Sequence, residues 1–420
     1  MEQPLITNDT IVLGLLALCL GFVFITSGSK SGFWKRFYTW VPGILLCYLL
    51  PSILASFNII SADNSRLYYM ASRYLLPAAL VLMTLSIDLK AVSNLGPKAL
   101  IMFLTGTAGI IIGGPLAILV VATFSPETVG GVGFDAVWRG LATIAGSWIG
   151  GGANQAAMLE IFEFNQDRFG EMVLVDIIGA NVWMAILLLG VGKTKRIDSW
   201  LKADASAIET LKQKVSEYTA SITRVPTLRD YMILFSMAFF AVGIAHFFGG
   251  YVSSWLTESV SSVSDPSSFF SFLGGEFFWM VVIATIMGVA LSFTKAKNYE
   301  GAGASKIGGV FIYILVATIG MQMDLSRILE NPGLILVGLI WIAFHAGLLI
   351  LVAKWIRAPF FFLAVGSQAN VGGAASAPVV AAEFHPALSS VGVLLAVLGY
   401  VVGTGGALFC AYLMEIAATL

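Results

Sequence analysis

The stretch Ser147-Trp148-Ile149-Gly150-Gly151-Gly152-Ala153-Asn154-Gln155 places three successive glycines and two amides inside an apolar segment that spans residues 137–160. Each glycine in a helix interior costs about 1 kcal/mol relative to alanine, so this pattern predicts a broken helix. Residues 358–383 carry a similar stretch, Gly366-Ser367-Gln368-Ala369-Asn370-Val371-Gly372-Gly373, followed by Ser376 and Pro378.

The composition places both stretches in a membrane protein. Hydrophobic residues make up 58% of the 420 residues and charged residues 11%, whereas soluble domains carry about 25% charged residues. The net charge of −1 excludes a nucleic acid held by bulk electrostatics. Apolar segments near the roughly 20 residues that cross a bilayer occur at 10–27, 38–57, 67–87, 97–123, 137–160, 171–192, 230–248, 273–294, 307–325, 332–353, 358–383 and 387–416.

The N-terminus and the cysteines add two expectations. Residues 1–10 contain Glu2 and Asp9 but no Lys or Arg, which does not fit the basic start of a cleavable signal peptide. The run 11–25 is therefore expected to be a retained first helix. Cys19, Cys47 and Cys410 lie in apolar runs, so neither a disulfide framework nor a zinc site is expected.

Short motifs recur in the same order in the two halves of the chain. Ile87-Asp88-Leu89, followed by Gly96-Pro97, corresponds to Met323-Asp324-Leu325, followed by Pro332-Gly333. Further along, Gly146-Ser147 corresponds to Gly366-Ser367, and Gly179 corresponds to Gly399. Together they predict two repeats of six segments, a first membrane repeat at 1–192 and a second at 230–420.

The repeats are joined by a polar linker at 193–229, expected on the cytoplasmic side. The interval from Lys193 to Asp230 holds 13 of the 47 charged residues, and residues 205–221 have the spacing of an amphipathic surface helix. If the two glycine-rich segments are re-entrant and the N-terminus lies outside, the repeats are inverted and the basic residues favour the linker side. If all twelve segments cross, the N-terminus lies inside. The expected fold is an all-α polytopic protein with about 10–12 transmembrane segments in two inverted repeats.

Asp176 lies six residues into the apolar run 171–192. A carboxylate near the bilayer centre costs roughly 2.5–3.5 kcal/mol, and such acids usually line an ion or proton path. The alternative is that the helix begins late and Asp176 is an interfacial charge at its N-terminus. The corresponding residue of the second half is Ala396, so a site built on this acid is asymmetric.

Paired glycine-interrupted segments in the two halves indicate a transporter binding site, where freed carbonyls coordinate a cation and half-helix N-termini face an anionic group. The alternative is that the glycines only allow close helix packing. This alternative accounts for the glycines, but it does not account for the Ser, Asn and Gln residues clustered with them. The predicted substrate and cation site comprises Ser147, Gly151, Gly152, Asn154, Gln155, Asp176, Asn181, Ser367, Gln368, Asn370, Gly372, Gly373 and Ser376, with Na⁺ at Asn154, Asn370 and Asp176.

Other polar residues are weaker candidates. Glu160 and Glu383, at the far ends of the two broken segments, are interpreted either as interfacial charges or as functional acids. His246, His345 and His385 lack the spacing of metal ligands and are interpreted as helix-end or packing residues.

Motifs and topology separate the possible function classes: enzyme, ATP-driven pump, channel, structural protein and secondary transporter. The chain has no HExxH or GxSxG motif, which argues against an intramembrane enzyme, and no P-loop, which argues against coupling to ATP hydrolysis. A channel usually forms a ring of subunits, and a structural membrane protein has no need of two broken helices. A secondary transporter remains.

The stretches Ser147 to Gln155 and Gly366 to Gly373, with the two Asp-Leu turns, resemble the YjcL-like family of bacterial integral membrane proteins, a domain-of-unknown-function family, over nearly the whole chain. That family is similar to the superfamily of bile acid:sodium symporters, glutamate:sodium symporters and cation:proton antiporters. The resemblance implies inverted repeats and a mobile core of the third to sixth and ninth to twelfth segments. It also implies a panel domain that often forms homodimers, and broken helices that cross in an X.

We therefore expect a sodium-coupled secondary transporter of a small organic solute, working by an elevator mechanism in a bacterial cytoplasmic membrane. No enzyme activity and no cofactor are expected, apart from Na⁺ or H⁺ as the coupling ion. Two alternatives stay open: a cation:proton antiporter that uses Asp176, and a membrane protein without a transport function.

Overall fold

The computed structural model describes residues 4–41, 43–62, 65–85, 95–203, 208, 224–265, 268–323, 330–385 and 388–420. Throughout these ranges the secondary structure is helical, and they contain no strand. The predicted turns at Asp88 and Asp324 and almost all of the predicted amphipathic helix at 205–221 lie outside the described residues.

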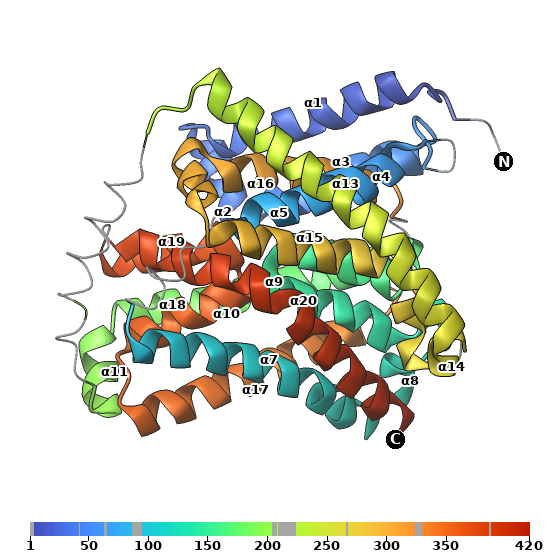
Figure 1. Cartoon of the computed structure of the whole chain (residues 1–420). Helices are drawn as coiled ribbons and strands as arrows, with labels where there is room; N and C mark the ends of the chain where they lie inside the picture. Colours follow the sequence, from blue (N-terminus) through green and yellow to red (C-terminus); the bar gives the residue numbers. More distant parts are fainter. Residues whose placement is uncertain are drawn as a thin grey trace.

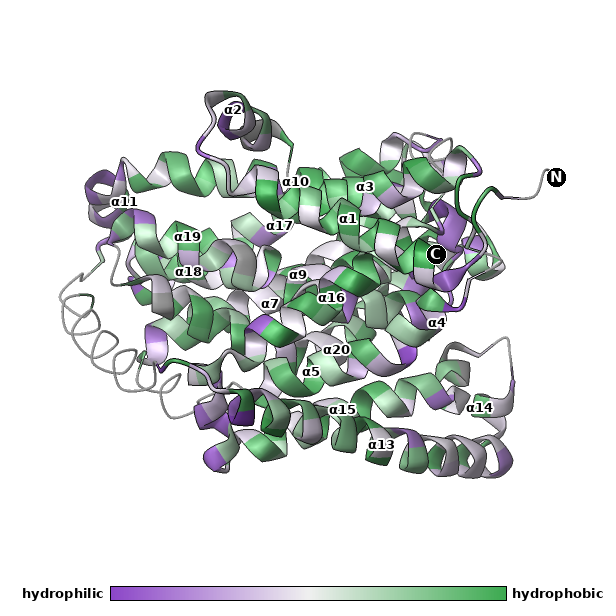
Figure 2. Cartoon of the chain, turned by 90° about the horizontal axis from the view of Figure 1, so that it is seen from above, coloured by the Kyte–Doolittle hydropathy of each residue, from purple (hydrophilic) through white to green (hydrophobic). Residues whose placement is uncertain are grey.

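The length and apolarity of the helices fit a membrane. Within the described ranges, six helices are long and apolar enough to cross a bilayer, and two bent pairs raise the number to eight. The six are α1 (Asp9–Ser27), α7 (Pro97–Ala122), α10 (Phe169–Val191, after the 3₁₀ turn η3, Gln166–Arg168), α13 (Leu228–Ser259), α17 (Gly333–Ile356) and α20 (Ser389–Thr419). The bent pairs are α2 (Gly32–Trp40) with α3 (Gly43–Ser56), and α15 (Glu276–Ser292) with η5 (Lys295–Ala302). Hydrophobic residues cover most of these helices (Figure 2), and the predicted all-α polytopic fold is confirmed.

The helices pack in two layers (Figure 1). The first, which we term the support layer, is held by a buried apolar cluster that includes Val81 in α5, Leu234 in α13 and Ala284 in α15. Its members are α1, α3, α4 (Leu67–Met70), the π-helical turn η1 (Ala71–Leu75), α5 (Leu76–Leu85), α13, α15 and α16 (Ala304–Gly320). The described parts of the segments 67–87 and 307–325, residues 67–85 and 307–323, therefore pack mainly in the support layer, whereas the resemblance implied that these segments belong to the core.

The second layer, termed the hairpin layer, contains both glycine-rich segments. It consists of α7, α9 (Val137–Ile161), α10, α17, α18 (Phe360–Val371), α19 (Gly373–Phe384) and α20. Glycines let α20 approach both broken segments closely: a methyl group on Gly399 would lie 2.7 Å from the carbonyl oxygen of Ile149 in the first, and one on Gly392 would lie 2.5 Å from the carbonyl oxygen of Ala377 in the second. Close packing thus accounts for some of the glycines, as the alternative interpretation of these residues proposed.

The segment α9 folds back on itself. Its backbone is non-helical at Gly151 (φ 73°, ψ −175°), and Arg139 Nη1 donates to the carbonyl oxygen of Phe162 at 2.6 Å. These two residues would be about 35 Å apart in a straight helix at 1.5 Å per residue. A methyl group on Gly146 would likewise lie 2.6 Å from the carbonyl oxygen of Asn154. We name α9 hairpin 1, with its tip at Gly151.

The second glycine-rich segment folds back in the same way. Helices α18 and α19 meet at Gly372 and Gly373, where Gly373 has φ 56°. The rings of Phe361, at the start of α18, and Phe384, at the end of α19, are 5.2 Å apart. We name this pair hairpin 2. Both segments therefore fold back on themselves, as expected of re-entrant segments, whereas the side of the N-terminus and the inversion of the repeats stay predictions.

The hairpins enter the layer from opposite ends. At the start of α7, Lys98 Nζ donates to the carbonyl oxygen of Arg357, next to the open end of hairpin 2, at 2.9 Å. The end of α7 leads through α8 (Pro126–Val129) and η2 (Gly133–Asp135) into Val137, the first residue of hairpin 1. In Figure 1, α11 (Thr194–Leu201) and hairpin 2 lie on the left and α8 on the right.

The two tips meet inside the protein. A methyl group on Gly373 would lie 3.9 Å from the Cα atom of Gly151. The breaks thus come together as the sequence pattern predicted, but two hairpins meet tip to tip where the resemblance implied two helices crossing in an X.

The tip geometry gives a testable contrast between two adjacent glycines. The backbone angles of Gly151 lie in a region open essentially to glycine alone, so Gly151→Ala is expected to cost about 1–3 kcal/mol of unfolding free energy. Gly152 is helical, and a methyl group there meets only Ile312 Cγ2, at 3.6 Å. Gly152→Ala is therefore expected to be neutral or to stabilise by about 0.4–1 kcal/mol. Thermal unfolding of the two variants in detergent, followed by tryptophan fluorescence, compares them; equal stability would contradict the assigned turn.

Candidate functional site

Asp176 in α10 lies against hairpin 1 and binds both of its arms. Ser147 Oγ and Gln155 Nε2 donate to Asp176 Oδ2 at 2.7 and 2.9 Å, and Trp148 Nε1 donates to Oδ1 at 2.7 Å. Ser147 and Trp148 precede the break at Gly151, and Gln155 follows it. The aspartate is buried and α10 begins at Phe169, seven residues before it, so the alternative of a helix that begins late at Asp176 does not hold.

The carboxylate of Asp176 has no basic partner among the described residues: its three donors are neutral, and no ion pair to it is found there. A buried charge is costly unless it is compensated. These donors fill three of the roughly four lone-pair positions of a carboxylate, so there is room for one further ligand.

Two tyrosines that the sequence analysis did not select lie beside hairpin 1. Tyr48 in α3 is buried and donates from its hydroxyl to Gln155 Oε1 at 3.5 Å. Tyr400 in α20 places Cε1 3.5 Å from the position of a methyl group on Gly151. A single tyrosine in an apolar run gives no signal by itself, because its partners are more than 100 positions away.

Asn154 follows the tip of hairpin 1 and is fully buried. Its Nδ2 donates to the carbonyl oxygen of Gly150 at 2.9 Å, and its Oδ1 accepts from Thr404 Oγ1, in α20, at 2.6 Å. The side chain therefore satisfies a carbonyl freed at the break and connects hairpin 1 to the other half of the chain.

Asn370, before the tip of hairpin 2, also connects its hairpin to the other half of the chain. Its Nδ2 donates to the carbonyl oxygens of Gly366 and Phe103, each at 2.9 Å, and its Oδ1 accepts from Thr107 Oγ1, in α7, at 2.7 Å. Both asparagine oxygens thus have a threonine partner, and the assignment of Na⁺ to them stays a prediction.

Ser367 belongs to a buried chain of hydrogen bonds. Trp183 Nε1 donates to Ser367 Oγ at 2.7 Å, and Ser367 Oγ is 2.7 Å from His345 Nε2. His345 Nδ1 is 2.9 Å from the carbonyl oxygen of Gly106, which can only accept, so Nδ1 carries the proton. In the neutral ring Nε2 therefore accepts from Ser367. The sequence analysis interpreted His345 as a packing residue and gave no sign of this chain.

Gln368 leaves one acceptor without a partner. Its Nε2 donates to Ser376 Oγ at 2.6 Å across the break of hairpin 2, while its Oε1 is buried and has no hydrogen-bond partner among the described residues. Orphan buried oxygens are uncommon. Near the junction of the tips, this oxygen is a candidate ligand for a cation.

Asn181 and Gly152 are less closely connected to the other candidates. Asn181 Nδ2 donates within its own helix, to the carbonyl oxygen of Ile177 at 2.7 Å. Gly152 lies next to the tip of hairpin 1 and packs on Ile312 in the support layer.

The comparisons with known proteins agree with a membrane protein of this size. The family model described as a protein of unknown function, DUF819, matches residues 14–416. The chain is also similar to the uncharacterized membrane protein YjcL of Bacillus subtilis (strain 168), at 23% identity over 403 residues, which covers 91% of this chain and 93% of YjcL. The chain therefore belongs to the DUF819 family.

Proposed function

We propose that the protein is a secondary active transporter of a small organic solute, coupled to sodium. The observation that carries the proposal is the junction of two re-entrant hairpins inside the hairpin layer, with buried polar side chains around it. Irregular backbone at membrane depth is tolerated only where it is buried in protein or lines a cavity. A structural role alone does not require two such breaks to meet.

The junction offers ligands for both signs of charge. The first arm of each hairpin ends at the tip with carbonyl groups, and the second arm begins there with free N–H groups. Helix C-termini favour cations and helix N-termini favour anions, so a sodium ion and an anionic or amino-acid-like solute fit side by side. Asp176 and the Oε1 atom of Gln368 supply further oxygen ligands on the cation side.

The same geometry favours alternating access by movement of the hairpin layer against the support layer. Hairpins that enter from opposite ends are expected of two inverted repeats, at 1–192 and 230–420. The similarity of the family to bile acid:sodium symporters, suggested by the sequence motifs, adds support. We place the protein in a bacterial cytoplasmic membrane, as a homodimer or a monomer, with the linker 193–229 inside.

A cation:proton antiporter is the second candidate, and the buried carboxylate of Asp176 without a described basic partner favours it. In that case a proton, and not a sodium ion, neutralises the carboxylate when the cation leaves. Ser147 Oγ is placed to accept from the protonated carboxyl at Oδ2.

The experiment that separates the candidates is thermal unfolding of the purified protein in sodium against choline, from about pH 6 to 9, for wild type and Asp176→Asn. A ligand that binds only the folded state raises stability by about 2.7 kcal/mol at 100 times its Kd. Sodium is expected to raise the melting temperature of the wild type and not of the variant. A pH response that disappears in the variant, without a sodium response, would indicate proton coupling. No response to either ion would reject coupled transport.

A further inference from the structure

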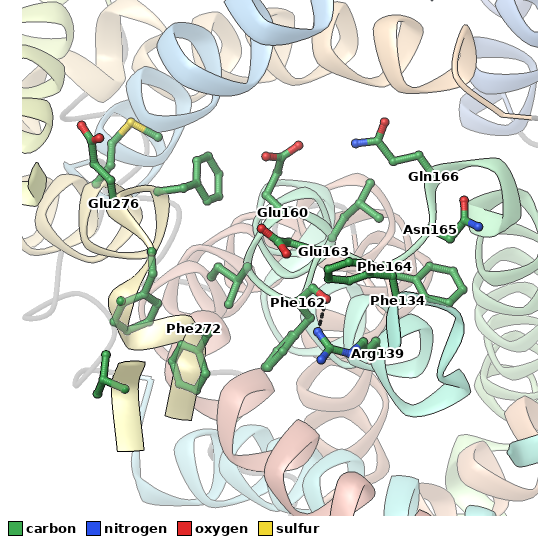
Figure 3. Close-up of a pocket in the computed structure, with 18 of the residues that line it drawn as sticks. Phe134, Arg139, Glu160, Phe162, Glu163, Phe164, Asn165, Gln166, Phe272 and Glu276 are labelled. Carbon is green, nitrogen blue, oxygen red and sulfur yellow. Dashed lines mark hydrogen bonds between the residues drawn. The ribbon is translucent and has the colours of Figure 1, made fainter. Parts of the chain in front are cut away.

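A large cavity separates the two layers at the open end of hairpin 1. Its volume is about 1210 Å³, and it is lined by both ends of α9, by η1, α13 and α15 of the support layer, and by Glu415 of α20. In Figure 3, Arg139, Glu160 and Glu163 lie on the hairpin side and Glu276 on the side of α15. None of the residues predicted from the sequence as the transport site lines this cavity.

Arg73 lies in one element of the support layer and contacts two others. It lies in the π-helical turn η1, an irregularity that is frequent at functional sites. Its carbonyl oxygen is 2.8 Å from Nε2 of His246 in α13, so that nitrogen donates. Its guanidinium lies over the ring of Phe277 in α15, 4.3 Å from the centroid.

Glu160, on the second arm of hairpin 1, is the partner of Arg73 in the other layer. Arg73 Nη1 is 2.6 Å from Glu160 Oε2, and the two side chains are 27% and 9% exposed. The hydroxyl of Tyr68 in α4 donates to the other carboxylate oxygen of Glu160. Gln166 Nε2 in turn donates to the hydroxyl of Tyr68 at 2.9 Å.

This ion pair lies in the wall of the cavity, on the arm of hairpin 1 that leads to the junction of the tips. Arg73 and Glu160 both line the cavity, and Gln155, which binds Asp176, precedes Glu160 by five residues on the same arm. That separation is about 7.5 Å along a helix. A hydrophilic molecule that passes from the cavity toward Asp176 along this arm meets the Arg73–Glu160 pair first.

We propose that Arg73 and Glu160, with Tyr68, form a gate between this cavity and the hairpin junction, closed in the present conformation. Its role in solute access rests on the proposed transport function. The ion pair joins the two layers, so it has to break whenever hairpin 1 moves away from the support layer. Because both partners are mostly shielded from water, removing either one leaves an uncompensated charge between the layers.

The gate is tested by the reactivity of a cysteine placed behind it. Ala156 is buried and lies one helical turn from Glu160 toward the tip, on the same face of the arm. In a background with Cys19, Cys47 and Cys410 replaced by alanine, Ala156→Cys is expected to react slowly with a charged maleimide. Adding Glu160→Gln or Arg73→Gln is expected to raise the rate about tenfold. The double variant is expected to react no faster than either single one, because both remove one interaction.

Three controls make each outcome decisive. Glu163→Cys, in the cavity and exposed, has to react in every background, and Ala153→Cys serves as a second buried reporter. Arg168→Gln removes an ion pair within the hairpin layer, to Glu171, and should leave the Ala156→Cys thiol protected. Unchanged rates on adding either Glu160→Gln or Arg73→Gln, or fully additive increases in the double variant, would overturn the gate. The assay needs no transport, so a missing sodium response in the same samples would reject only the proposed function.

Discussion

Replacing Asp176 with alanine is expected to lower the free energy of unfolding by about 3–6 kcal/mol, because two buried donors and one partly buried donor lose their acceptor at about 1–3 kcal/mol each, with partial relaxation. The donors are Ser147, Trp148 and Gln155. They come from both arms of hairpin 1, so the variant also loses the interaction that holds the arms to α10. Chemical unfolding of the detergent-solubilised protein, followed by tryptophan fluorescence, measures the change.

Asp176→Asn is the matched control for the charge. Its oxygen can accept from Trp148, its nitrogen can donate to Ser147, and rotation of the Gln155 amide turns an acceptor toward it. We therefore expect a much smaller loss of stability than for alanine. Asp198→Ala, in α11, controls for loss of a less buried carboxylate, since Asp198 Oδ1 accepts one bond, from the backbone N–H of Phe360 at 2.7 Å. If Asp176→Ala is no more destabilising than Asp198→Ala, the connecting role of Asp176 is wrong.

Asn370→Ala is expected to lower the free energy of unfolding by about 2–5 kcal/mol, since it removes three hydrogen bonds: the one from the Thr107 hydroxyl and the two to the carbonyl oxygens of Phe103 and Gly366. If Asn370 were only a transport ligand, the variant would lose function and keep its stability. Thermal unfolding of Asn370→Ala therefore separates the two roles.

A double-mutant cycle with Thr107→Val isolates the bond between the two halves of the chain. We expect a coupling energy of about 0.5–3 kcal/mol between Asn370 and Thr107. Asn154→Ala with Thr404→Val is the equivalent cycle at hairpin 1. Additive effects in both cycles would show that the threonine bonds do not hold the hairpins in place.

Local sequence predicted the positions of the elements well. The apolar segments at 97–123, 171–192 and 332–353 match α7, α10 and α17 within a few residues, because a run of apolar residues is itself the requirement for crossing a bilayer. The segment at 230–248 proved longer, since α13 continues to Ser259 through a polar stretch that lies beside the cavity.

The candidate site was predicted less completely. The glycine runs located both breaks, and Asp176, Ser147 and Gln155 do come together. Arg73, Tyr48 and His345 were not selected, because their partners lie in distant segments and their own neighbours in the chain are ordinary. Asn154 and Asn370 were selected for their polarity, but polarity alone cannot distinguish a ligand from a side chain that satisfies a freed carbonyl.

The sequence by itself determined that this protein is helical, belongs in a membrane and breaks two of its helices at Gly151 and near Gly372. These properties follow from composition and from the local cost of glycine in a helix, which depend on neighbours in the chain. The tertiary structure alone decided that both segments fold back, that their tips meet, and that Asp176 binds both arms of hairpin 1. The direction in which a chain leaves a glycine depends on the surfaces against which its two arms can pack, and those surfaces come from the other half of the protein.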